Sequence, residues 1–128
     1  MADRSLPFFM RYLIARCFEV DRKYDKQLYN CSLRSGGYMY SQFSSRRDCK
    51  RSKMVICFDG DRIVGWGIRS KHGIQKAVML YVSKTYRRKG IGTEIYRKLT
   101  RGVAKKNIKV YRDYANRKFF GRLFQSVS

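Results

Sequence analysis

Residues 79–93 read Met-Leu-Tyr-Val-Ser-Lys-Thr-Tyr-Arg-Arg-Lys-Gly-Ile-Gly-Thr: an apolar strand, a basic turn and the first residues of a helix. After the turn, apolar residues recur at helical spacing, at Ile91, Ile95, Leu99 and Val103. This pattern predicts a helix from about Gly90 to Lys106. A strand that enters a glycine-rich turn and then a helix can bind phosphate, because consecutive backbone N–H groups and the helix N-terminus attract an anion.

The turn itself combines glycine with positive charge. Gly90 and Gly92 let the backbone approach an anion closely and adopt dihedrals that other residues avoid. The three cations at 87–89 stand where the helix dipole mildly disfavours positive charge, so they indicate a nearby anion. The alternative is a basic, solvated first turn. No Gly-Lys-Ser/Thr is present, which excludes a Walker loop.

Three short apolar segments lead up to this unit. Met54–Phe58 ends in the hairpin signal Asp59-Gly60, and Ile63–Ile68 follows it. A turn at 71–73 then leads into a third strand, from about Gln75 to Val82. These segments predict three successive antiparallel strands.

The remaining elements lie on both sides of this centre. Phe8–Val20 has apolar residues at helical spacing and predicts a helix. Residues 21–52 form an irregular, basic region rich in Ser, Tyr and Arg, with a second short helix around Asp25–Cys31. Ile108–Tyr111 predicts a fourth strand and Asn116–Phe124 a last helix. The predicted order is helix, loop, β-β-β-α-β-α, an α/β fold of the α+β type.

The length and the net charge of the chain limit the classes of function that it can have. The chain has 128 residues, which suits a single domain over 1–128, and 44% hydrophobic residues can fill a core. Thirty Lys and Arg against nine Asp and Glu give a net charge of +21, which favours an anionic partner. No apolar stretch approaches the roughly 18 residues of a membrane span, and the N-terminus lacks a convincing signal peptide. We therefore expect a cytoplasmic protein.

The cysteines and the histidine restrict metal chemistry. The four cysteines are Cys17, Cys31, Cys49 and Cys57, and their spacing lacks the close pairs of a zinc site. His72 is the only histidine, which excludes a three-histidine site. Without a secretion signal, we expect reduced thiols rather than disulfides.

Residues 79–93 resemble the acetyl-CoA-binding segment of the GNAT family of N-acetyltransferases. The family pattern is Arg/Gln-x-x-Gly-x-Gly/Ala after a strand of the form apolar-x-Val, and residues 80–92 match it. Phe58–Gly65 is similar to the family's hairpin before its central strand, and Asn116–Phe124 to a later helix. The resemblance covers about Met54–Phe124, together with the first helix predicted over Phe8–Val20.

The resemblance implies a mixed, mostly antiparallel sheet flanked by helices, with acetyl-CoA bound where the sheet splays between the third and fourth predicted strands. Pantetheine would pair with the backbone of Leu80 and Val82, and the pyrophosphate would lie on the N–H groups from Arg88 to Thr93. The implied cofactor-binding residues are Leu80, Val82, Arg87, Arg88, Lys89, Gly90, Ile91, Gly92, Thr93 and Asn116. The implied reaction is direct attack of an amine on the thioester, without a metal.

The general base is not identifiable from the pattern. The family often places a glutamate near the central strand, but residues 74–82 carry no carboxylate. His72 has suitable chemistry but lies in a predicted turn, where a solvated histidine is commoner. Asp113 follows the fourth predicted strand, and it could equally pair with Arg112 or Arg117.

The usual acid is also absent. The family often uses a tyrosine on the last helix to protonate the leaving thiolate, and Phe120 occupies that position here. Tyr111 and Tyr114 lie close by and are substitute candidates, although a tyrosine is more often a packing residue. The thiolate could also leave unaided.

The sequence supports two main hypotheses for the function, and a third ranks below them. The first is an N-acetyltransferase whose acceptor amine lies on a protein or other macromolecule, favoured by an acidic surface. The second is a non-catalytic module, such as a viral host-takeover effector in the host cytoplasm, that binds nucleic acid or an acidic protein. Tyr and Arg residues are interleaved over 29–51, where they could stack on bases and contact phosphates, which supports this second reading.

The third reading places a basic helix face, formed by Arg97, Lys98, Arg101 and Lys105, on a membrane surface.

The family's last two strands are missing after Phe124, which would leave a sheet edge open to a partner or to oligomerisation.

Overall fold

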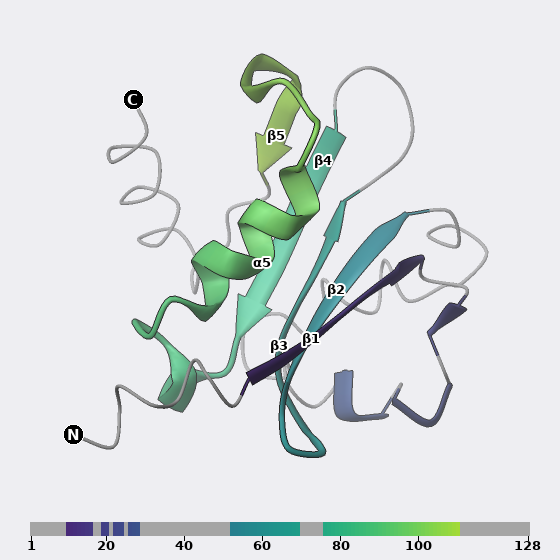
Figure 1. Ribbon diagram of the computed structural model, residues 1–128, viewed down its shortest axis with the longest axis vertical. Helices are drawn as coiled ribbons and strands as arrows, with labels where there is room; N and C mark the ends of the chain where they lie inside the picture. The colour runs from purple at the N-terminus through teal and green to yellow at the C-terminus, as the bar shows by residue number, and fades with distance from the viewer. Residues whose placement is uncertain are drawn as a thin grey trace.

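The computed structural model describes residues 10–16, 19–20, 22–24, 26–28, 52–69 and 76–110. The strands are β1 (Met10–Arg16), β2 (Lys53–Asp59), β3 (Arg62–Arg69), β4 (Lys76–Val82) and β5 (Ile108–Val110). They form one sheet in the order β1-β2-β3-β4-β5, antiparallel except for the parallel pair β4/β5 (Figure 1). The sheet is the mixed, mostly antiparallel one that the sequence predicts.

Helices connect the later strands. The helix α5 (Ile91–Thr100) carries the chain from β4 to β5, as a parallel pair requires. The 3₁₀-helices are η3 (Arg22–Tyr24), η4 (Lys84–Tyr86) and η5 (Lys105–Asn107). None of the helices in the described ranges combines the length and hydropathy that a membrane crossing requires.

The central strands form where the sequence predicts them. Residues 54–58 of β2 and 63–68 of β3 are buried, as expected for strands covered on both faces. Gly60 has φ 62° in the tight turn between them, a conformation that favours glycine. The turn expected at 71–73 and the helix expected at 116–124 lie outside the described residues.

The helix predicted over Phe8–Val20 is wrong: residues 10–16 form strand β1. β1 pairs with β2 from Met10 opposite Asp59 to Arg16 opposite Lys53. Without β1, the backbone groups on that edge of the buried strand β2 would lack strand partners. A short apolar pattern fits either helix or strand, and here the pairing decides.

The helix α5 ends six residues earlier than predicted, at Thr100 rather than Lys106. The chain turns there: the Val103 N–H donates to the Thr100 carbonyl, and Gly102 takes φ 80°. Two cations from the sheet donate to carbonyls in the last turn of α5, Lys53 to Lys98 and Arg69 to Leu99. These contacts stabilise the early end.

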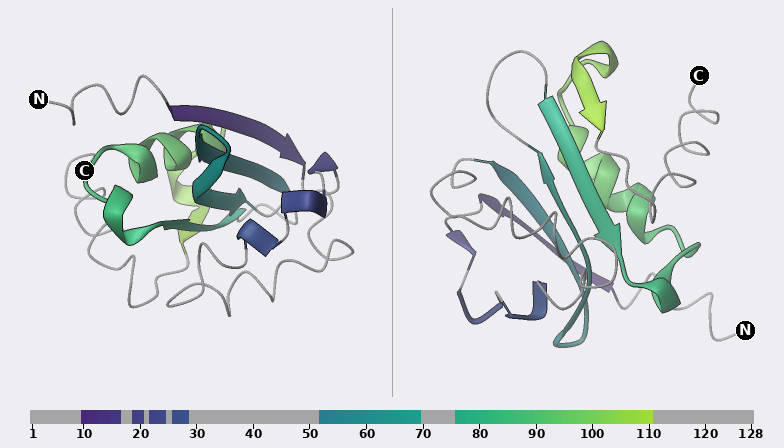
Figure 2. Two further views of the ribbon diagram at one scale, coloured as in Figure 1. Left: turned by 90° about the horizontal axis from the view of Figure 1, so that it is seen from below. Right: turned by 180° about the vertical axis from the view of Figure 1, so that it is seen from behind.

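α5 packs closely on one face of the sheet (Figure 2). A Cβ at Gly67 would lie 2.6 Å from Cγ2 of Ile95 and 2.7 Å from Cδ1 of Leu99. Glycine in β3 therefore permits this approach. The buried residues of this layer are Met10, Val55, Cys57, Val64, Val78, Leu80, Val82, Ile91, Ile95 and Leu99.

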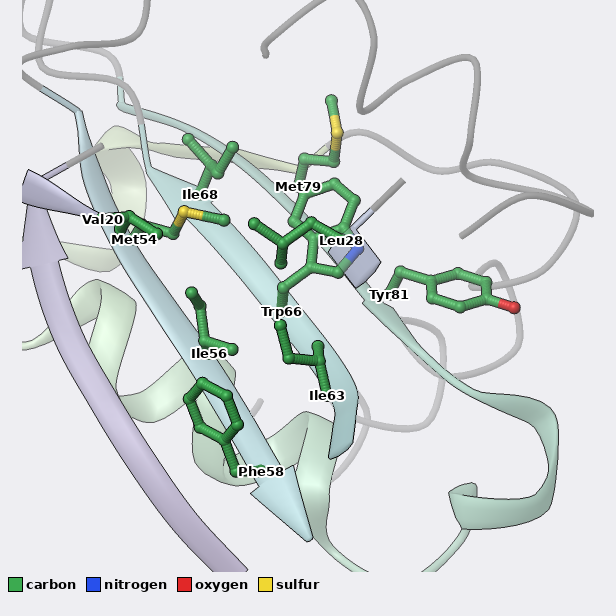
Figure 3. Close-up of a cluster of buried hydrophobic side chains, with 10 residues drawn as sticks. All are labelled: Val20, Leu28, Met54, Ile56, Phe58, Ile63, Trp66, Ile68, Met79 and Tyr81. Carbon is green, nitrogen blue, oxygen red and sulfur yellow. The ribbon is translucent and has the colours of Figure 1, made fainter. Parts of the chain in front are cut away.

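The opposite face carries a second apolar cluster (Figure 3). Trp66 and Phe58 are its largest buried side chains, and Val20 and Leu28 join the cluster from the segment after β1. Residues 26–28 are helical, inside the short helix predicted around Asp25–Cys31. Cys57 is buried on the α5 face and forms no disulfide, while Cys17, Cys31 and Cys49 lie outside the described residues.

Candidate functional site

The site begins at the end of β4, where backbone groups face away from β3. The Ser83 N–H donates to the Val64 carbonyl at 2.8 Å, which makes these two residues a hydrogen-bonded pair. Hydrogen-bonded and non-hydrogen-bonded pairs alternate along an antiparallel ladder. Val82 and Leu80 therefore direct their N–H and C=O groups toward the β5 side of β4.

β5 does not run along the whole of β4. The two strands pair over Lys76–Val78, opposite Ile108–Val110. β4 continues for four more residues, to Val82, and so extends beyond β5 as described (Figure 1). The backbone groups of Leu80 and Val82 lie in this extension.

The turn that follows contains two left-handed residues. Arg88 has φ 63° and Gly90 has φ 89°. A Cβ at Gly90 would meet no atom within 4 Å, so the space in front of this residue is open and only its dihedrals call for glycine. Arg88 and Gly90 are both exposed.

Gly90 also caps the N-terminus of α5. The first helical bond runs from the Glu94 N–H to the Gly90 carbonyl at 3.0 Å, and Gly90 offers no side-chain cap. The N–H groups of Ile91, Gly92 and Thr93 therefore have no intrahelical acceptor. Three donors and the positive end of the helix dipole are therefore available at this turn to bind an anion.

Arg87 has a role that the sequence did not indicate. Its Nε donates to the Val82 carbonyl at 2.8 Å, and its Cζ lies 5.3 Å from the ring centroid of Tyr81. The side chain thus folds back onto the end of β4. It links the strand to the turn, while Arg88 and Lys89 continue toward α5.

A second contact anchors the turn to the rest of the sheet. The Tyr86 hydroxyl donates to Oδ2 of Asp59 at 2.6 Å, across to the β2–β3 hairpin. This hydrogen bond raises the pKa of Tyr86. Local pattern offers no signal for it, because the two residues are 27 positions apart.

The acid in the first turn of α5 is neutralised by cations of its own helix. Glu94 forms ion pairs with Arg97 at 2.6 Å and Lys98 at 3.1 Å. The hydrogen bond from Lys98 is the main reason that the pKa of Glu94 is lowered. The start of α5 consequently keeps its positive potential.

Nine of the predicted site residues come together at this one place: Leu80, Val82, Arg87, Arg88, Lys89, Gly90, Ile91, Gly92 and Thr93. Tyr111, Asp113, Tyr114 and Asn116 lie outside the described residues, as do His72 and Phe120. In the described part of the chain, no three His, Cys, Asp or Glu side chains gather as a metal ion would require.

Comparison with known sequences identifies one family. A family model described as an acetyltransferase (GNAT) domain matches residues 36–123. The match spans more than half of the chain and includes the turn before α5. Among curated proteins, no sequence matches.

Solved structures share the fold. Ard1 from Thermoplasma volcanium is 13% identical, with a TM-score of 0.64 over 91% of this chain and 81% of that one. The PaiA N-acetyltransferase from Thermoplasma acidophilum, solved with coenzyme A, is 13% identical, with a TM-score of 0.62 over 91% and 88%. An aminoglycoside acetyltransferase from an uncultured soil metagenomic sample, solved with sisomicin, is 12% identical, with a TM-score of 0.60 over 96% and 90%.

Proposed function

The chain belongs to the GNAT family of acetyltransferases, and on this premise we propose that it transfers an acetyl group from acetyl-CoA to an amine. One observation carries the proposal: the three N–H donors at the start of α5, behind the left-handed Gly90. Acetyl-CoA supplies an acetyl group already activated as a thioester. The residues of this chain have to bind acetyl-CoA and accept the proton that the acceptor amine loses.

The donor set fits a pyrophosphate. The N–H groups of Ile91, Gly92 and Thr93 would hold it, and the open space in front of Gly90 leaves room for its oxygens. Arg88 and Lys89 would add attraction as cations. Along β4, the backbone groups of Leu80 and Val82 would hold the amide-bearing arm of the cofactor.

For proton transfer we propose the residues that follow β5. β5 is parallel to β4, so at Val110 it points toward the end of the sheet that carries Val82. Asp113 would accept the proton of the acceptor amine, and Tyr111 or Tyr114 would donate one to the leaving sulfur. Asn116 would contribute to cofactor binding.

We propose a protein or other macromolecule with an acidic surface as the acceptor. The net charge of +21 supports this choice, because it attracts acidic surfaces over long distances. A similar structure is an aminoglycoside acetyltransferase solved with sisomicin, so an aminoglycoside is the competing class of acceptor.

The test measures binding and turnover separately. Calorimetry with acetyl-CoA should give saturable binding by the whole chain. Free-thiol release should then rise with one class of acceptor in a panel of acidic proteins, basic proteins and aminoglycosides. Absence of binding would refute the proposal, and binding without turnover on any acceptor would favour the non-catalytic module.

A further inference from the structure

Basic side chains from four parts of the chain gather where α5 ends. Lys53 opens β2, and Arg69 closes β3 directly opposite it in the register. α5 and the segment after it supply the others. We call this group the basic end of the molecule: Lys53, Arg69, Lys98, Arg101, Lys105 and Lys106. In Figure 1 it is the upper side, where β4 and β5 begin.

Four of these cations, Lys53, Arg69, Lys98 and Arg101, are close enough to repel one another. Burial lowers the pKa of Lys53, and the positive charges of Arg69, Arg101 and Lys98 lower it further. Two donors are used by the helix: Lys53 donates to the Lys98 carbonyl, and Nη1 of Arg69 donates to the Leu99 carbonyl at 2.9 Å. Nε of Arg69 is buried without a hydrogen-bond partner.

The acids in the part of the chain that the structure describes do not balance this charge. The acids in the described ranges are Glu19, Asp59, Asp61 and Glu94. Asp59 and Asp61 flank the β2–β3 turn, at the other end of the sheet, and Glu19 accepts the Arg16 N–H. Glu94 pairs with Lys98 and Arg97 one turn before the basic end. Contacts within the fold account for Lys53, Arg69 and Lys98. None of the four described carboxylates forms an ion pair with Arg101 or Lys106.

The cofactor does not supply the missing anion. Gly90 and the basic end lie at opposite ends of α5, and a ten-residue helix is about 15 Å long. We propose that the basic end binds the phosphate backbone of a nucleic acid, as a second site separate from the cofactor turn.

The surface suits phosphates better than an acidic protein. Specific protein interfaces are built around buried aromatic or aliphatic anchors. The exposed large apolar side chain in the described ranges is Ile14, on β1, and the basic end contains none. A phosphate backbone is bound by charge and hydrogen bonds, without apolar anchors.

The experiment compares two triple variants in binding a short fluorescein-labelled DNA duplex of random sequence, followed by anisotropy across a salt series. The first carries Arg101→Gln, Lys105→Gln and Lys106→Gln. The matched control carries Arg22→Gln, Lys23→Gln and Lys26→Gln. Each variant removes one arginine and two lysines, and all six positions are exposed.

The control segment lies far from the basic end. Oε1 of Gln27 accepts the Ile63 N–H at 3.1 Å, which places this segment beside the β2–β3 turn. The two variants therefore change the net charge equally and differ in where the charge is removed. Calorimetry with acetyl-CoA on each variant reports separately on folding and on the cofactor turn.

We expect the basic-end variant to bind the duplex at least about tenfold more weakly at moderate salt. Its slope of log affinity against log salt should be shallower by about one for each phosphate that the protein no longer neutralises, up to about three. The control should change affinity by less than about threefold, because distant charge is screened.

Three results would overturn the proposal. Equal reductions of affinity in both variants would mean that the duplex responds to net charge alone. Competition by polyglutamate as strong as that by unlabelled duplex would point to an acidic protein. Equally strong competition by phosphatidylserine vesicles would point to a membrane surface. None of these results depends on acetyl transfer.

Discussion

At the scale of single residues, the turn before α5 is held in a costly conformation. Arg88 adopts φ 63° without the freedom of glycine, which costs about 1 kcal/mol or more. Contacts of the two preceding residues support it: Arg87 donates to Val82, and Tyr86 to Asp59. The turn is thus preorganised, so an anion would not have to order it on binding.

The first prediction concerns Gly90. Gly90→Asp should abolish measurable acetyl-CoA binding, because it places a negative charge beside the proposed pyrophosphate site. Gly90→Asn is the matched control, since asparagine has nearly the same shape, tolerates positive φ and is neutral. Calorimetry on both folded variants measures their acetyl-CoA affinities. Equal affinities would show that the pyrophosphate does not bind at this turn.

The second prediction concerns the acid. If Tyr111 or Tyr114 protonates the leaving sulfur, its change to Phe should lower turnover roughly 10²–10⁴-fold and leave acetyl-CoA affinity unchanged. The other tyrosine then serves as the control. Steady-state thiol release with an active acceptor is the measurement. Full activity in both variants would show that the thiolate leaves without help from either.

At the scale of elements, α5 connects the sheet to the cofactor turn. Its apolar side packs on β3 through Gly67, and its first turn holds the donors. The position of those donors therefore depends on how closely helix and sheet approach. Core packing sets the geometry of the site.

The third prediction tests that approach. Gly67→Ala should destabilise the fold by about 1–3 kcal/mol, because its Cβ would overlap Ile95 and Leu99. Urea unfolding measures the change. Gly60→Asn in the β2–β3 turn is the control, since a Cβ there meets nothing and asparagine tolerates positive φ. A urea unfolding midpoint that is unchanged in Gly67→Ala would contradict the close packing of α5 on β3.

The fourth prediction concerns the ion pairs on α5. The pKa of Glu94 is lowered in the folded state, so its contribution to stability is present above its ordinary pKa of 4.5. It is lost as the pH falls through the lower, folded pKa. Glu94→Gln should cost about 0.5–1 kcal/mol at neutral pH, the sum of two surface pairs. Urea unfolding of both proteins should converge in acid, and a constant difference would contradict this origin.

At the scale of the whole molecule, charge dominates. A net charge of +21 on 128 residues creates a field that no single contact describes. Within the described ranges, acids flank the β2–β3 turn, while cations gather where α5 ends. The acids at the β2–β3 turn lie beside the basic turn before α5, since Tyr86 contacts Asp59, so described cations occur at both ends and described acids mainly at one.

The fifth prediction separates local from general charge. Acetyl-CoA affinity should fall as salt rises, because cations act on the cofactor over about 8 Å at physiological ionic strength. Arg88→Gln with Lys89→Gln should flatten this dependence. Arg22→Gln with Lys23→Gln, an equal charge change elsewhere, should flatten it less. Calorimetry across a salt series is the measurement. An acetyl-CoA affinity that does not change with salt in the unmodified protein would show that electrostatic attraction does not contribute to cofactor binding.

Local signals in the sequence were sufficient for the centre of the fold. Apolar runs separated by Asp59-Gly60 predicted β2 and β3, and the strand before Arg87 predicted β4. The glycines at the start of α5 predicted where that helix begins. Such signals succeed because turn chemistry and hydrophobic periodicity act over a few neighbouring residues.

Tertiary structure alone decided three other features. β1 is a strand because β2 pairs with it, and α5 stops at Thr100, where residues 30 and 45 positions away in the chain donate to its last carbonyls. Tyr86 anchors the turn before α5 by donating to Asp59, which is 27 positions away in the chain. Each feature depends on a partner that the chain brings near only when it folds, and no short window of sequence contains that partner.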